Sequence, residues 1–212
     1  MIGRGANRRC VVDPVESRFC LKFELHASER TPAGLRARLR RWLGRRSPRY
    51  GDNATELRAW RWLQRRLGAD ALAGRFAACH GIVVTPDGPA LRCECVRLED
   101  GTPAPSLYVV LFGMESPPWR LPQLIAAVDD FEAFLLEHGI PLFDLNAGNF
   151  VVVPEGDGVR LVCVDAKSVL AGKELVPVSR WVPVLRRRKV RRRAGRLRER
   201  VLAAMAALTS PL

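Results

Sequence analysis

The pattern of apolar residues changes near Asp100, and this change limits the fold more than any other feature of the sequence. On its N-terminal side, short alternating apolar stretches between turn residues predict strands. The predicted strands are 10–12, 19–25, 81–85 and 89–98, with helices between them over 29–50 and 53–67. Helical spacing dominates the C-terminal side. The sequence therefore predicts an α+β fold, with a β-rich part and a mainly helical part on either side of a cleft.

The C-terminal part is predicted to contain two long helices and three short extended pieces. The helices cover 121–138 and 184–208, and the extended pieces are 140–143, 150–153 and 159–164. A chain of 212 residues is long enough to bury a sizeable core. We expect a single domain with two lobes, residues 1–99 and 100–212.

The charge of the chain is large but unevenly distributed. A formal net charge of +13 favours an anionic partner such as nucleic acid, a membrane surface or phosphate groups. The sum hides an acidic centre: residues 1–80 carry +11, residues 81–179 carry −8 and residues 180–212 carry +10. The middle of the chain is therefore acidic and is flanked by two basic segments, so the total charge is weak evidence for a nucleic-acid partner.

The sequence predicts no membrane span and no secretory leader. There is no apolar stretch of about 18 residues, and Met1 to Asp13 lacks the apolar core of a signal sequence. The six cysteines show neither a C-x-x-C pair nor the Cys/His spacing of a zinc site. We expect them to be buried free thiols of a cytoplasmic protein.

Lys22 is one of only four lysines, and it lies in the middle of the predicted strand 19–25. Its neighbours Leu21 and Phe23 are apolar. If the ammonium is buried it needs a counter-charge, because an unpaired buried charge is costly. Glu56, near the start of the next helix, is the candidate partner. The alternative is a lysine whose head group reaches solvent from an exposed strand face.

Oxygen-bearing side chains gather in the second part of the sequence. Asp144 and Asn149 are five residues apart in a loop, and Asp165 follows the predicted strand 159–164. Loops on a rigid scaffold hold many binding groups, and magnesium prefers oxygen ligands completed by phosphates. These residue types also favour tight turns, which is the alternative explanation for each taken singly.

The order of these features is more specific than any one of them. Gly3 and Gly5 form a short glycine-rich loop, although the third glycine of a dinucleotide-binding fingerprint is missing. The loop is followed by the strand lysine, the helix glutamate, two strands, a helix, Asp-x-x-x-x-Asn and a strand-end Asp. This is the order of parts in the protein-kinase catalytic core.

The sequence resembles the PhoP regulatory network protein family (YrbL-like), a kinase-like family of bacteria, over nearly its whole length. The resemblance is carried by short motifs: Gly3-Arg4-Gly5, Arg8-Arg9-Cys10, Asp13-Pro14, Cys20-Leu21-Lys22, Glu56-Leu57, Gly81-Ile82-Val83, Thr85, Asp100-Gly101, Ser106-Leu107, Asn149-Phe150, Val164-Asp165, Leu175-Val176-Pro177 and Trp181. It implies a two-lobed protein-kinase-like fold with a reduced C-terminal lobe. It also implies that ATP and Mg²⁺ are the cofactors.

The resemblance also implies roles for individual residues. Lys22 would contact the nucleotide phosphates, and Glu56 would orient the Lys22 side chain. The loop with Gly3 and Gly5 would cover the phosphates. The backbone from Glu94 to Val96 would face adenine.

In the second part, Asp144 would be the catalytic base, and Asn149 and Asp165 would hold magnesium. The phosphate acceptor is not identified by any feature of the sequence.

Several motifs depart from those of protein kinases. Leu142-Phe143 replaces the usual His-Arg, and Asp165-Ala166-Lys167 replaces Asp-Phe-Gly. No Ala-Pro-Glu motif follows. Met1 lies almost on the glycine loop, so we expect either a start further upstream or a missing first strand. These departures leave open a pseudokinase that binds nucleotide, or only a partner, without turnover.

A third interpretation comes from the basic segment 180–200. Its arginines could bind the phosphates of a nucleic acid or an anionic membrane. A solvated helix face is the favoured explanation, because no aromatic residues interleave the run.

Overall fold

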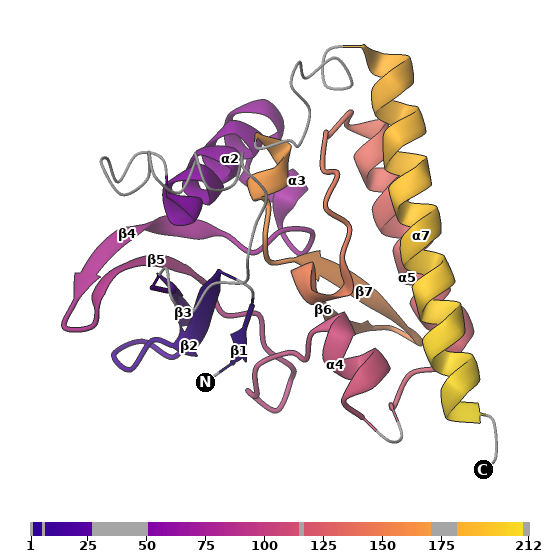
Figure 1. Cartoon of the computed structure of the whole chain (residues 1–212), viewed down its shortest axis with the longest axis horizontal. Coiled ribbons are helices and arrows are strands. Elements are labelled where there is room, and N and C mark those ends of the chain that lie inside the picture. The colour runs from indigo at the N-terminus through magenta and orange to yellow at the C-terminus, as the bar shows by residue number, and fades with distance from the viewer. Residues whose placement is uncertain (1, 6, 27–50, 115–116, 171–181, 210–212) are drawn as a thin grey trace. The chain divides into compact units, whose positions relative to one another are not determined.

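The computed structural model describes residues 2–5, 7–26, 51–114, 117–170 and 182–209 (Figure 1). The chain divides into two compact units. Unit 1 consists of Met1–Ala73 and Ala77–Val96, and unit 2 consists of Gly74–Phe76 and Arg97–Leu212. The described part of the chain contains no helix that is long and apolar enough to cross a membrane.

Unit 1 is built on a five-stranded antiparallel sheet with the order β1-β2-β3-β5-β4. The strands are β1 (Gly3–Arg4), β2 (Arg8–Val12), β3 (Phe19–Glu24), β4 (Cys79–Thr85) and β5 (Gly88–Glu94). Helix α2 (Asp52–Leu67) packs against β3, β4 and β5, and the short α3 (Ala69–Leu72) follows it. Helical spacing predicts one face of this helix with Leu57, Trp60, Leu63 and Leu67, and α2 buries the first three, whereas Leu67 at its end is only partly buried.

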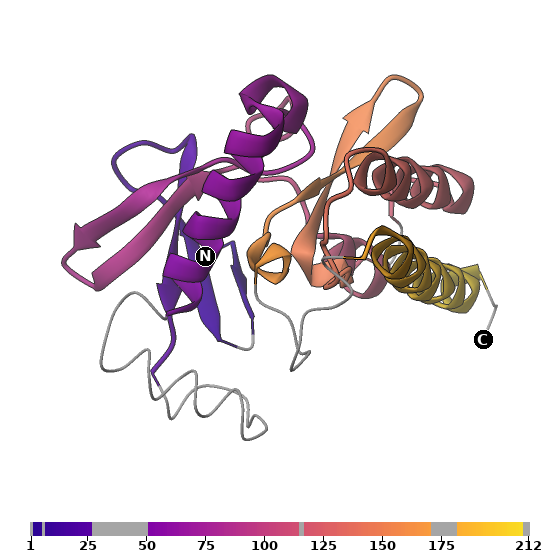
Figure 2. The ribbon, with the colours of Figure 1, turned by 90° about the horizontal axis from the view of Figure 1, so that it is seen from above.

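Unit 2 combines helices with one hairpin. Its elements are α4 (Leu107–Phe112), α5 (Leu121–Glu137), η3 (Ala147–Asn149), β6 (Phe150–Glu155), β7 (Gly158–Cys163), η4 (Lys167–Val169) and α7 (Pro183–Thr209). Helices α5 and α7 lie side by side, and α5 also packs on β7 (Figure 2). Phe131 of α5 and Phe150 of β6 meet edge to face with ring centroids 5.0 Å apart, which ties helix and hairpin into one core.

The predicted α+β class is confirmed, with an antiparallel sheet in the N-terminal part and helices in the C-terminal part. The long helices predicted over 121–138 and 184–208 are present as α5 and α7, within a residue or two at each end. The predicted helix over 29–50 lies outside the described residues. The motifs Leu175–Pro177 and Trp181 also lie outside them.

Two predictions about extended segments were wrong. Residues 140–143 form no strand, although Ile140 and Leu142 are fully buried. Their apolar run reflects burial alone, because the N–H groups of Phe143 and Asp144 bond to the Ser168 hydroxyl rather than to a neighbouring strand. The strand predicted over 89–98 ends at Glu94.

Candidate functional site

In unit 1, β3 and α2 bring Lys22 and Glu56 together in the interior. Lys22 is 7% exposed and Glu56 is 2% exposed. The Lys22 ammonium donates to Glu56 Oε1 at 2.7 Å, and the Asn53 side chain donates to the backbone carbonyl of Lys22 at 2.7 Å. The predicted pairing is therefore confirmed, and the solvent-reaching alternative for Lys22 is excluded. Its role toward a nucleotide remains a prediction.

Glu56 also binds a second cation that the sequence did not indicate. The Arg8 guanidinium, from β2, donates to Glu56 Oε2. The register of β2 with β3 pairs Cys10 with Lys22, and this pairing puts Arg8 within reach of the same carboxylate. One buried carboxylate thus serves two cations, so the group carries a net positive charge. Such a charge attracts anions such as phosphate.

The surroundings of Lys22 keep it protonated. Burial by itself lowers the pKa of the ammonium, but the electrostatic influence of Cys93 and Glu56 outweighs burial and holds the pKa well above its usual 10.5. Lys22 is therefore a fixed positive charge at neutral pH and is unsuited to act as a base.

The glycine-rich loop begins in β1, where Gly3 pairs with Cys10. The N–H of Gly5 donates to the carbonyl of Arg8 at 2.9 Å. Neither glycine has a positive φ, and a Cβ at Gly3 would meet no atom within 4 Å. The fold itself therefore does not require glycine at Gly3. Open space beside this backbone is what close approach of a ligand needs.

The segment predicted to face adenine follows β5. The N–H of Glu94 donates to the backbone carbonyl of Ala78 at 2.8 Å, and the N–H of Cys95 donates to the backbone carbonyl of Arg18 at 2.9 Å. The N–H of Val96 forms no hydrogen bond within the described residues. This leaves the donor available for a ligand. The carbonyl of Glu94 is a second such group, because among the described residues it accepts only a long contact from the Cys20 thiol, at 3.6 Å.

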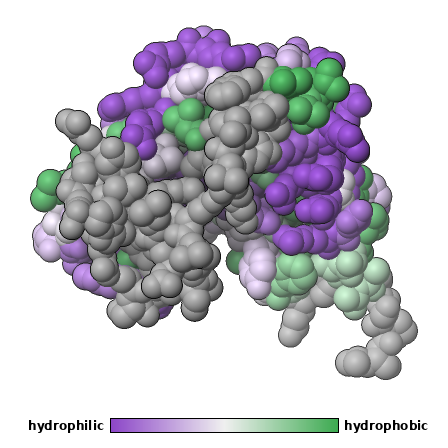
Figure 3. Space-filling model, turned by 45° about the horizontal axis from the view of Figure 1, so that its top comes forward, coloured by the Kyte–Doolittle hydropathy of each residue, from purple (hydrophilic) through white to green (hydrophobic). Residues whose placement is uncertain are grey.

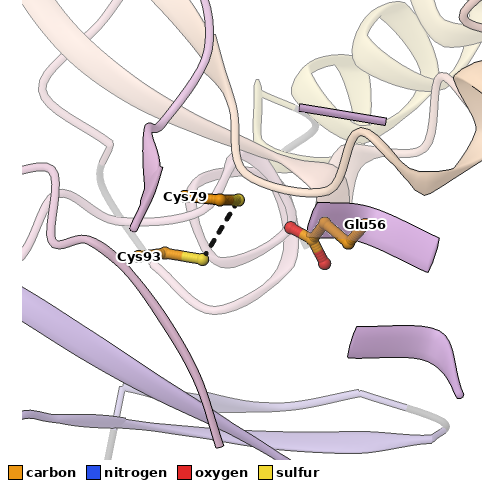
Figure 4. Close-up of side chains that lie close together, drawn as sticks. All are labelled: Glu56, Cys79 and Cys93. Carbon is orange, nitrogen blue, oxygen red and sulfur yellow. Dashed lines mark hydrogen bonds between the residues drawn. The ribbon is translucent and has the colours of Figure 1, made fainter. Parts of the chain in front are cut away.

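Two thiols lie beside the Lys22–Glu56 pair, and no pattern in the sequence indicated this arrangement. Cys79 and Cys93 are directly opposite each other on β4 and β5, and their sulfur atoms are 3.4 Å apart. Figure 4 shows them with the Glu56 carboxylate nearby. The donor atoms of all three residues lie within 4.8 Å of one another. The Cys93 hydrogen bond, together with burial, raises the pKa of Cys79 well above its usual 9.0.

In unit 2, hydrogen bonds link the three segments that carry Asp144, Asn149 and Asp165. The side-chain amide of Asn149 donates to the backbone carbonyl of Asp144 at 2.9 Å. The N–H of Val164, one residue before Asp165, donates to the Asn149 carbonyl at 2.8 Å. All three residues are partly exposed. The structure thus brings together the three oxygen-bearing residues that the sequence singled out.

Two further residues act on this group in unit 2. The Ser168 hydroxyl accepts from the N–H groups of Phe143 and Asp144, at 3.3 and 3.1 Å, and so fixes the backbone at Asp144. The Lys167 ammonium pairs with Asp165 Oδ2 at 3.0 Å. Lys167 occupies the third position of the motif that departs from Asp-Phe-Gly, and here that departure introduces a cation beside the proposed metal ligand.

Comparison with models of known protein families finds no match, and no curated protein sequence matches the chain. The resemblance to the kinase-like family of the PhoP regulatory network therefore stays a prediction, as do the functions it implies.

Proposed function

We propose that the chain is a kinase-like protein of the PhoP regulatory network (YrbL-like) type that binds Mg-ATP. The observation that carries this proposal is the buried ion pair between Lys22 of β3 and Glu56 of α2. A buried pair is weak evidence for a stabilising role, because its desolvation offsets much of its attraction. A lysine held rigidly in the charged state by a helix glutamate is the arrangement that kinases use to hold nucleotide phosphates.

The residues of unit 1 would bind the nucleotide. Lys22 would pair with the phosphates, and the open backbone at Gly3 and Gly5 would admit them closely. The carbonyl of Glu94 and the N–H of Val96 offer an acceptor and a donor of the kind that adenine requires.

The residues of unit 2 fit magnesium. Asn149 and Asp165 supply oxygen ligands, which hard divalent cations prefer, and phosphate oxygens commonly complete the shell. The bound ion would neutralise charge on the phosphates. Because the Lys167 ammonium pairs with Asp165, this cation must give up part of that contact when the metal binds.

Asp144 is the proposed base if phosphate is transferred. Its carboxylate would accept the proton of the acceptor, and Ser168 would hold its backbone in place. The alternative is a pseudokinase that binds nucleotide or a partner and does not turn over. The departures at Leu142-Phe143 and at Ala166-Lys167 favour this alternative, whereas the retained Lys22, Glu56, Asp144, Asn149 and Asp165 favour transfer.

A thermal-shift titration with Mg-ATP tests the proposal, since a ligand that binds only the native state must stabilise it. We expect a rise in the midpoint for the native protein that is lost in Lys22→Ala and in Asp165→Ala. Asp157→Asn is the control, because it replaces an exposed acid in the turn of the same unit. No stabilisation of the native protein would refute nucleotide binding.

Transfer is tested separately by following phosphate release or transfer from ATP. If the protein turns over, Asp144→Asn should abolish turnover while leaving the Mg-ATP stabilisation in place. Turnover that is unchanged in Asp144→Asn removes this residue from the role of base. Binding without any turnover supports the pseudokinase.

The exposed face of α7 favours a second role, as a binding surface for an anionic partner within the segment 180–200. Val190, Ala194, Leu197 and Val201 are buried on one side of this helix. Besides Arg200, which donates to the Asn146 side chain, the helix exposes five arginines outside this buried stripe, namely Arg187, Arg188, Arg191, Arg192 and Arg196. None of the five has an ion pair within the described residues. Figure 3 shows a broad hydrophilic surface over this part of the molecule.

A further inference from the structure

Cys79, Cys93 and Glu56 come from three elements that are packed together. Cys79 lies on β4, Cys93 lies opposite on β5, and Glu56 projects from α2, which packs on both strands. Glu56 is 2%, Cys79 9% and Cys93 0% exposed. Figure 4 shows the two sulfur atoms adjacent, with the carboxylate of Glu56 close to them. Two soft donors and one hard donor thus lie within 4.8 Å of one another in the folded chain.

The distance between the two sulfur atoms distinguishes between two kinds of chemistry. A disulfide requires sulfur atoms about 2.0 Å apart. Two thiolates bound to one tetrahedral zinc ion, each at about 2.3 Å, are separated by about 3.8 Å. The observed 3.4 Å is much closer to the second value. Binding one ion between the sulfurs needs a small opening, whereas a disulfide needs a much larger closure.

We propose that Cys79, Cys93 and Glu56 form a binding site for a thiophilic divalent cation of the zinc class. Two thiolates and one carboxylate suit a borderline metal ion, whereas magnesium and calcium prefer oxygen ligands alone. This site is therefore chemically different from the Asn149 and Asp165 oxygens in unit 2. Three protein ligands leave the fourth tetrahedral position to water or to an external ligand.

The charge of the buried cluster supports this assignment. Glu56 is paired with the cations Lys22 and Arg8, so with both thiols protonated the cluster carries a net charge of one positive. When a divalent cation binds, two S–H bonds break, two metal–sulfur bonds form and two protons leave to solvent. No atom is oxidised or reduced. The net charge of the cluster is the same before and after, so binding does not add charge to the interior.

Glu56 can take part while keeping both of its cations. An ionised carboxylate has about four lone-pair positions, and Lys22 and Arg8 each bind one of its oxygen atoms. The proposal does not rest on nucleotide binding, since its decisive ligands are the two cysteines. It does imply that a metal ion and a nucleotide would act on the same glutamate.

Titration of the reduced protein with Co²⁺, followed by displacement with Zn²⁺, tests the site. We expect one equivalent of Co²⁺ to give a thiolate-to-cobalt charge-transfer band and the visible bands of tetrahedral cobalt, both removed by Zn²⁺. Cys79→Ser and Cys93→Ser should each weaken binding at least about tenfold. Cys163→Ser, which replaces a buried cysteine of unit 2, and Cys10→Ser, which replaces one on the neighbouring β2, should bind like the native protein.

The measurement on the native protein keeps the test decisive even if a variant fails to fold. Absence of the charge-transfer band in the reduced native protein overturns the proposal. A band that persists in both Cys79→Ser and Cys93→Ser also overturns it. The rate of alkylation, followed by mass spectrometry, gives a second readout: buried thiols react through transient opening, so Zn²⁺ should slow the labelling of Cys79 and Cys93 and leave that of Cys10 unchanged. Because neither readout involves ATP, their failure is distinguishable from a failure to bind Mg-ATP.

Discussion

The charged groups of the two units are held in opposite ways. In unit 1, Lys22 and Glu56 are both more than nine-tenths buried, and they depend on each other and on Arg8 for compensation. In unit 2, Asp144, Asn149 and Asp165 are partly exposed and are placed by backbone hydrogen bonds and by a pair with Lys167. Water can solvate the second group but has little access to the first.

This contrast determines how each group can be tested. Removing one member of a buried set leaves an uncompensated charge, so stability and function change together. Removing a partly exposed oxygen changes little apart from what that oxygen binds. A loss of function in a variant of Asp144, Asn149 or Asp165 can therefore be interpreted directly. For a variant of Lys22 or Glu56, the stability must be measured as well, so that loss of function is not confused with unfolding.

Glu56→Gln should have a greater effect than any other variant. It leaves Lys22 and Arg8 as two neighbouring cations without a counter-charge, and breaking a buried pair from one side typically costs about 3–5 kcal/mol. The free energy of unfolding, from urea titration at neutral pH, measures the loss. Glu99→Gln, at an exposed turn, is the control and should change stability by less than about 0.5 kcal/mol. A loss in Glu56→Gln as small as that of the control would mean that the two units do not differ in this way.

High pH should destabilise the protein through two buried groups of unit 1. The pKa of the Cys79 thiol is raised above 9.0, and that of Lys22 above 10.5, so the folded protein retains protons that the unfolded chain loses. The stabilisation is complete below those pH values and falls as pH rises through them, by up to about 1.4 kcal/mol per pH unit for each group. Urea titrations from neutral pH to about pH 10 measure the part of this slope that comes from Cys79, because the Lys22 part begins only above the usual lysine pKa of 10.5. Cys79→Ala should make this slope shallower.

Ser168→Ala applies the same contrast within unit 2. Ser168 is buried, and its hydroxyl is the partner of two backbone N–H groups. Leaving buried donors unsatisfied costs about 1–3 kcal/mol. Ser168→Ala should therefore lower the stability of the protein as well as its function, as variants of the buried ion pair in unit 1 do. Because the N–H of Asp144 is one of the two, any turnover should fall in kcat with KM for ATP little changed. A parallel change in both constants would indicate a general structural defect instead. Ser168→Thr, which keeps the hydroxyl, should restore both stability and kcat.

Lys167→Met tests whether the departure from Asp-Phe-Gly limits metal binding. Lys167 and Asp165 are 24% and 12% exposed in their side chains, so their pair contributes at most about 1 kcal/mol. Its removal should lower the Mg²⁺ concentration needed for half-maximal ATP stabilisation by roughly fivefold, the factor that corresponds to that energy. Arg160→Met, which removes a cation paired with Glu155 in the same unit, is the control. Weaker binding in Lys167→Met would show that the ammonium serves the nucleotide rather than competing with the metal.

Burial and local pattern were predictable from the sequence, whereas strand register and side-chain packing were not. The Lys22–Glu56 pair was predictable because a strand lysine between apolar neighbours needs a counter-charge. Arg8 and the Cys79–Cys93 contact were not, since both depend on which residues face each other across the sheet. The buried segment at Ile140 was taken for a strand because an apolar run records burial and not backbone pairing.

The least change in stability should come from α7, where exposed arginines contrast with the paired Arg198. Arg198 bonds to Asp129 and Glu132 of α5, whereas Arg188 and Arg192 face solvent. The double variant Arg188→Gln/Arg192→Gln should therefore change stability by less than about 0.5 kcal/mol. If this face binds an anionic partner, the variant should weaken adsorption to vesicles containing phosphatidylserine by about 2 kcal/mol in total, because each basic residue near such a surface contributes about 1 kcal/mol. Co-sedimentation with these vesicles at low and high salt measures the adsorption.

Equal adsorption of variant and native protein would show that the arginines only contact solvent and do not bind an anionic membrane. Preferential binding to duplex DNA would instead identify nucleic acid as the partner.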